Sequence, residues 1–82
     1  MVIMNFIVNE NFRNMDIITF LELNLKYGDY IWIMNEKGQG FSGYYYGDNN
    51  QSTFQFANDS NGKTETIEIS KLQMLEILER SK

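Results

Sequence analysis

The sequence has 82 residues, which is the length of one small domain spanning residues 1–82. Its hydrophobic content of 43% and charged content of 22% are those of an ordinary folded chain. It contains no cysteine and no histidine, which excludes disulfides, thiol nucleophiles, Cys/His zinc sites and histidine acid–base catalysis.

The charge balance favours a protein partner over nucleic acid. Seven basic and eleven acidic residues give a net charge of −4, and the basic residues are scattered along the chain. Binding to a phosphate backbone needs several basic residues on one face, so we expect no non-specific DNA binding. No stretch reads as a membrane span and residues 1–8 lack the basic region of a signal peptide, so we expect a cytoplasmic protein with no membrane contact.

Turn signals divide the chain into short segments. Residues 2–8 form an apolar run typical of a strand, which pairs either within the chain or with a neighbour. The next segment is ambiguous, because an apolar helical face with Asp16 as N-cap and Gly28 as C-cap competes with the strict alternation of residues 21–27. We predict a short helix or turn over residues 14–22 and extended chain after it.

From Gly28 onward the pattern predicts strands. The strands are expected at residues 30–34, 41–46, 52–57, 64–69 and 73–79. A short connection over residues 70–72, of the length of one 3₁₀ turn, precedes the last segment, for which a short helix is the competing interpretation. Short strands at this spacing predict an all-β fold, a small five-stranded barrel with a short N-terminal strand or helix extension.

Alternation assigns the two faces of these strands. The residues expected to point inward are Ile31, Ile33, Phe41, Tyr45, Phe54, Phe56, Ile67, Ile69, Leu75 and Ile77. Those expected to point outward are Tyr30, Trp32, Met34, Tyr44, Tyr46 and Gln55. Gly43 lies in the middle of its strand, where a bend allows a small barrel to close.

Three segments resemble small-barrel motifs. Residues 25–33, LKYGDYIWI, resemble the opening of SH3-like barrels, and residues 41–45, FSGYY, with Asp48 resemble the first Sm motif. Residues 69–77 resemble the second Sm motif in their apolar spacing. The resemblance covers residues 25–78 and implies an SH3-like or Sm-like barrel that forms homo-oligomers through its open strand edges. The Arg-Gly of the second Sm motif is Ser70-Lys71 here, so the uridine pocket of that family is not implied.

The outward aromatic side chains are the strongest candidate binding surface. Tyrosine and tryptophan are enriched at binding hot spots, although strands favour aromatics and the N-terminal segments could cover this face. The polar loop over residues 47–52 either hydrogen-bonds a ligand or is a plain turn. The predicted ligand- or partner-binding residues are Tyr30, Trp32, Tyr44, Tyr46, Asp48, Asn49 and Gln55.

Two other features are weaker candidates. Lys37 with the following Gly-Gln-Gly could cradle a phosphate, but a hairpin turn is the favoured interpretation. Glu65 and Glu68 are three residues apart, so they lie on opposite faces of a strand and do not form an acid–base pair. We therefore expect no enzymatic activity, no metal and no cofactor.

Two functions remain open. The first is a non-catalytic, oligomeric binding module that uses an exposed aromatic face or an inter-subunit pocket to bind a nucleotide, an RNA base or a protein partner. The alternative is a small acidic inhibitor from a phage or mobile element that blocks a basic surface of a host defence protein or sequesters a defence signalling nucleotide. The alternative draws on the acidity and on ten asparagines and nine isoleucines, which indicate an AT-rich coding sequence.

Overall fold

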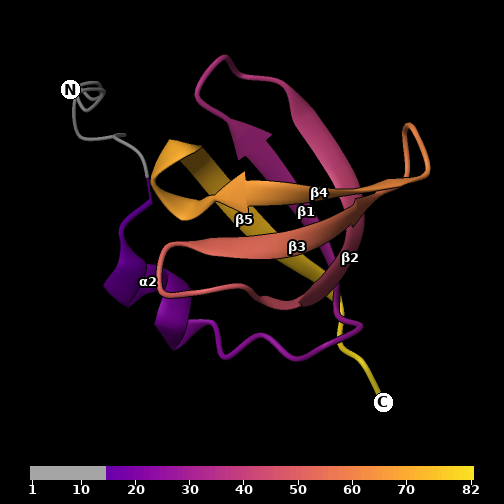
Figure 1. Ribbon diagram of the computed structural model, residues 1–82, viewed down its shortest axis with the longest axis horizontal. Coiled ribbons are helices and arrows are strands. Elements are labelled where there is room, and N and C mark those ends of the chain that lie inside the picture. The colour runs from indigo at the N-terminus through magenta and orange to yellow at the C-terminus, as the bar shows by residue number, and fades with distance from the viewer. Residues whose placement is uncertain (1–14) are drawn as a thin grey trace, which may run out of the picture.

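The structure of the chain is a computed structural model that describes residues 15–82 (Figure 1). The strand predicted over residues 2–8 lies outside the described residues. The elements are helix α2 (Ile17–Glu22), strands β1 (Tyr30–Asn35), β2 (Gly40–Asp48), β3 (Thr53–Asn58), β4 (Lys63–Glu68) and β5 (Leu72–Glu79), and the 3₁₀ turn η1 (Ile69–Lys71). The all-β prediction is confirmed, and the last segment is a strand rather than a helix.

All strand pairs are antiparallel, and the order in the sheet is β4-β3-β2-β1-β5. β2 pairs with β1 through Gly40–Tyr44 and with β3 through the segment that runs from Gly43 to Asp48. Figure 1 shows β2 curving as it passes from one partner to the other. This curvature rolls the sheet into a barrel-like form, with α2 lying at one end beside η1.

The core confirms the predicted facing of the strands. Seven of the ten residues expected to point inward are buried, and Phe41, Ile67 and Ile77 are partly buried against them. Two further core residues, Leu72 and Phe20, were not among those expected to point inward. The ring of Phe20 stacks on that of Phe54 with centroids 5.4 Å apart, so α2 closes the end of the core.

α2 lies within the range predicted for a helix or turn, residues 14–22, and ends at Glu22, the last residue of that range. The Asp16 carboxylate accepts a hydrogen bond from the Thr19 amide at 2.7 Å, and this contact lowers the pKa of Asp16. The longer helix with Gly28 as its C-cap does not form, because Leu23 is the C-cap and Asn24 adopts a left-handed φ of 52°. The alternating residues 21–27 form no strand; the guanidinium of Arg80 instead donates to the carbonyls of Leu23 and Asn24 at 2.9 Å each.

A fully buried carboxylate joins this segment to the C-terminal end of the described chain. Asp29 has no exposed surface and accepts hydrogen bonds from the Lys26 amide at 2.9 Å, the Ser81 amide at 2.7 Å and the Arg80 guanidinium at 3.0 Å. Burial alone would raise the pKa of Asp29, but these three donors together lower it below its ordinary value. The ionised carboxylate is therefore part of the native packing.

Gly43 is where two strands approach most closely. A Cβ atom at this position would lie 2.1 Å from the Ala57 carbonyl oxygen and 2.9 Å from the ring of Phe56. Gly43 stands in the short stretch of β2 that pairs with both β1 and β3. The curve of β2 thus depends on the absence of a side chain here, in agreement with the predicted role of this glycine.

Candidate binding surface

The four predicted surface aromatics lie together on the outer face of β1 and β2. Tyr30 is the cross-strand partner of Tyr44, and their ring centroids are 4.8 Å apart. Tyr46 follows Tyr44 on the same face and stacks on Tyr27, with centroids 5.0 Å apart and planes 5° from parallel. We call Tyr27, Tyr30, Tyr44 and Tyr46 the tyrosine strip. Tyr27 was not among the predicted binding residues, because it precedes the turn at Gly28 and its contact with Tyr46 joins segments far apart in the sequence.

The rings of the strip differ in how far they reach solvent. Tyr27 is 67% exposed, Tyr44 43% and Tyr46 39%, which leaves three aromatic faces or edges available for contact. Tyr30 is half-buried, and its hydroxyl donates to Asp59 at 2.5 Å, a contact that raises the pKa of Tyr30. Tyr30 therefore supports the strip, whereas the other three rings form its contact surface.

Trp32 extends this face along β1. It is half-buried and lies opposite Ser42 on β2 and Glu76 on β5. Its indole ring covers Gly40, where an added Cβ would come within 2.5 Å of the ring. α2 does not cover this face, since its one buried residue packs in the core. The sequence left two N-terminal segments that could cover this face, the helix and the strand predicted over residues 2–8. The helix does not cover it, and the predicted strand lies outside the described residues.

Carboxylates flank the aromatic rings. Asp59 accepts a hydrogen bond from the Tyr30 hydroxyl. On β5, Glu76 is the cross-strand neighbour of Trp32, and Glu79 is the cross-strand neighbour of Tyr30. Glu79 also lines a shallow hollow of about 300 Å³ with Tyr30 and Tyr44, to which Arg80 and Lys82 add positive charge. The surface is thus aromatic at its centre and charged at its margin, with acids in the majority.

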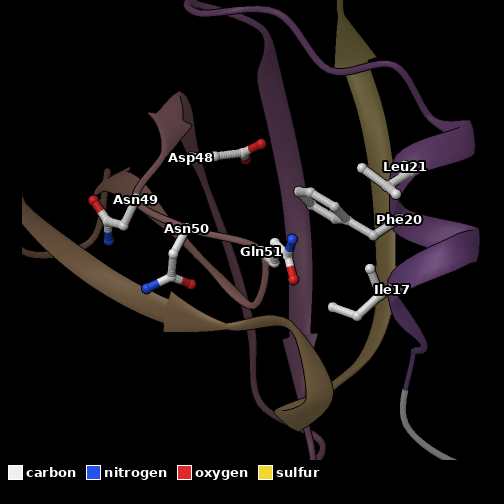
Figure 2. Close-up of a pocket in the computed structure, with 7 residues that line it drawn as sticks. All are labelled: Ile17, Phe20, Leu21, Asp48, Asn49, Asn50 and Gln51. Carbon is white, nitrogen blue, oxygen red and sulfur yellow. The ribbon is translucent and has the colours of Figure 1, made fainter.

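The other predicted site residues lie around the end of β2 and on the neighbouring strand β3. The Asn49 side-chain oxygen accepts from the Gln55 amide at 2.9 Å, and Gln55 also donates to the Thr66 hydroxyl at 3.2 Å. Asp48 accepts a hydrogen bond from the hydroxyl of buried Tyr45. Burial and this carboxylate raise the pKa of Tyr45 well above its ordinary value, so the hydroxyl remains a donor. Asp48 and Asn49 border a cavity beneath α2 (Figure 2).

The two weaker candidates have ordinary structural roles. The side chain of Asn35 accepts from the amides of Lys37 and Gln39 at 2.9 and 3.0 Å, so the Gly-Gln-Gly segment is the favoured hairpin turn. Glu65 accepts a hydrogen bond from the Asn61 side chain, and Glu68 forms an exposed ion pair with Lys71 of η1. Within residues 15–82 no group of three or more acidic side chains is placed to hold a metal ion.

Comparison with known proteins gives no relative from which a function could be inferred, so the functional proposal is based on the fold and on this surface. A scan against protein-family models, a search of curated proteins and a search of solved structures found no match to this chain. In the described part of the chain, no helix has the length and apolar character needed to cross a membrane. The class that the fold defines is a small antiparallel β domain of barrel-like form.

Proposed function

We propose that this protein is a non-catalytic binding module that holds a basic segment of a protein partner on its tyrosine strip. The observation that carries the proposal is the row of exposed rings of Tyr27, Tyr44 and Tyr46 on one face, which the described helix α2 does not cover. Three neighbouring exposed tyrosines are more than scattered surface apolar residues account for. Tyrosines bring large contact area at low cost in side-chain entropy, and they dominate binding hot spots.

The chemistry of the strip favours lysine and arginine in the partner. An ammonium or guanidinium group is attracted to the face of an aromatic ring, and this attraction strengthens when water is excluded. Asp59 and Glu79 stand beside the rings and supply opposite charge at the margin. The net charge of −4 adds long-range attraction that speeds encounter with a basic surface.

The strand order and the 3₁₀ turn before β5 support an SH3-like or Sm-like assignment for the barrel. The same surface suits the inhibitor role as well, because a small acidic domain that covers a basic patch blocks whatever that patch binds. Both roles use the tyrosine strip, so one set of variants tests both.

The test is a selection of random peptides on the wild-type protein. We expect the selected peptides to be rich in lysine and arginine, and to change the fluorescence of Trp32, the single tryptophan, on binding. A Tyr44→Ser/Tyr46→Ser double variant should bind them about thirtyfold or more weakly, as expected for loss of hot-spot residues. Raising the salt concentration should weaken the wild-type complex.

The matched control for this selection is Ile18→Ser, which also removes an exposed apolar side chain, on α2 rather than on the strip. It should leave peptide affinity unchanged. Equal binding of the peptides by wild type and the double variant would refute the proposal, and so would enrichment of acidic peptides.

Self-association is a separate expectation for this fold. β4 and β5 end the described sheet, so each has one unpaired edge within residues 15–82. Unpaired edges are templates for strand addition, and we propose that copies of the chain pair through them. Size-exclusion chromatography with light scattering should give a mass above that of one chain. A single-chain mass across a dilution series would contradict this expectation.

A further inference from the structure

The cavity beneath α2 has two unlike walls. One wall is the apolar side of α2, and the other is the polar loop that joins β2 to β3 (Figure 2). Its volume is about 550 Å³, within the range of pockets that hold small ligands. The lining residues are Ile17, Phe20, Leu21, Asp48, Asn49, Asn50 and Gln51.

Within residues 15–82, the apolar wall faces no apolar side chain from the opposite side of the cavity. Leu21 is 62% exposed and Ile17 is partly buried, while Phe20 forms the floor as part of the core. Figure 2 shows the side chains of Asp48 and Gln51 reaching toward this wall from the loop. A ligand that fits must therefore have an apolar body and a polar end.

The polar wall is held in place before any ligand arrives. Gly47 adopts a φ of 94° in the bulge between Tyr45 and Asp48, and the Tyr45 hydroxyl donates to the Asp48 carboxylate. The side-chain oxygen of Asn50 accepts from the amides of Ser52 and Thr53 at 2.8 and 3.0 Å. A loop fixed by its own hydrogen bonds loses little entropy on binding, so its polar groups are pre-organised.

The charge of the lining selects among ligands. Among the described residues that border the cavity, Asp48 carries the only charge, and its second carboxylate oxygen has no partner within residues 15–82. The side chain of Gln51 is exposed and offers both a donor and an acceptor. A phosphate or carboxylate ligand would meet a negative group and no cation, whereas an amine or amidinium would be neutralised by Asp48.

We propose that this cavity binds a small organic cation, whose apolar body lies against Ile17 and Leu21 and whose nitrogen donates to Asp48. This site is separate from the tyrosine strip, and the inference does not depend on the function proposed for that strip. It uses one residue of the sequence-predicted site, Asp48, for a ligand of opposite charge to a nucleotide phosphate.

The test uses two probes of nearly equal shape and opposite charge, benzamidine and benzoate. Titrations followed by NMR should show saturable shifts of the amides of residues 48–51 and the methyl groups of Ile17 and Leu21 with benzamidine. Benzoate should bind about tenfold or more weakly, because Asp48 attracts one probe and repels the other. Comparable binding of benzoate, or no saturable shift at the cavity, would overturn the inference.

Variants separate the charge at the cavity from the charge of the whole protein. Asp48→Asn keeps an acceptor for the Tyr45 hydroxyl and should reduce the preference for benzamidine to about twofold or less. Glu65→Gln removes the same charge outside the cavity and outside the tyrosine strip, and should leave the preference unchanged. Leu21→Asn should weaken both probes, with Ile18→Ser as its control on the same helix. An equal loss of preference in Asp48→Asn and Glu65→Gln would refute a local role for Asp48.

Discussion

A Gly43→Ala variant is expected to lose about 3 kcal/mol of unfolding free energy, at the upper end of the effects seen when a packed site is overfilled. The added methyl group would stand 2.1 Å from the Ala57 carbonyl oxygen, which is a backbone atom of the neighbouring strand. The strands must separate to admit it, and this breaks pairing where β2 is shared between β1 and β3. Urea denaturation should show the loss, with a midpoint of thermal unfolding about 15 °C lower.

The control for this prediction is Gly38→Ala. Gly38 has a φ of 82° and nothing within 4 Å of an added Cβ, so only backbone strain opposes the substitution. That strain is worth about 1 kcal/mol. A Gly43→Ala variant as stable as Gly38→Ala would show that β2 and β3 lie further apart than described.

An Asp29→Ala variant is expected to lose about 3 kcal/mol of unfolding free energy, because it leaves buried hydrogen-bond donors without their acceptor. The amides of Lys26 and Ser81 and the guanidinium of Arg80 all donate to this carboxylate. The matched control is Glu68→Ala, which breaks an ion pair whose side chains are both more than half exposed. The Glu68→Ala substitution should lower the free energy of unfolding by about 0.5 kcal/mol or less.

The Asp29 contribution should also depend on pH. The pKa of Asp29 in the folded protein is lowered from an ordinary value of 3.8, so its stabilisation is complete above that value and is lost as the pH falls through the folded pKa. Asp29→Asn cannot titrate, and the gap in unfolding free energy between wild type and this variant should narrow from pH 5 downward, about one unit above the ordinary pKa. A gap that stays constant between pH 5 and pH 2 would contradict the ionised state assigned to Asp29.

The sequence predicted the strands well because apolar and polar residues alternate along most of them, as their buried and exposed positions do. Residues such as Ile31, Ile33, Phe54 and Phe56 point inward at a period of two, and the turns between strands carry glycine and asparagine. Local signals also placed Asp16 at the start of the helix. A single sequence is enough to predict an element where its local pattern and its tertiary contacts favour the same structure.

The missed features arise from contacts between distant segments. Phe20 is a core residue because α2 folds over Phe54, and no period within a six-residue helix reveals that. Asp29 looks like a turn residue, yet two of its three hydrogen-bond donors, Arg80 and Ser81, lie more than fifty positions further along the chain. Asp48 follows the bulge between Tyr45 and Asp48 and borders the cavity beside α2, so the alternation of β2 did not predict its surroundings.

The position of β5 has a consequence for how the chain is made. β1 to β4 pair with their immediate neighbours in sequence, whereas β5 pairs with β1, the first strand of the described residues. During synthesis from the N-terminal side, β1 is made before the strand that pairs with its outer edge. Until β5 pairs with it, that edge of β1 is a template for strand addition, and the arrival of β5 with the Arg80–Asp29 contact covers it.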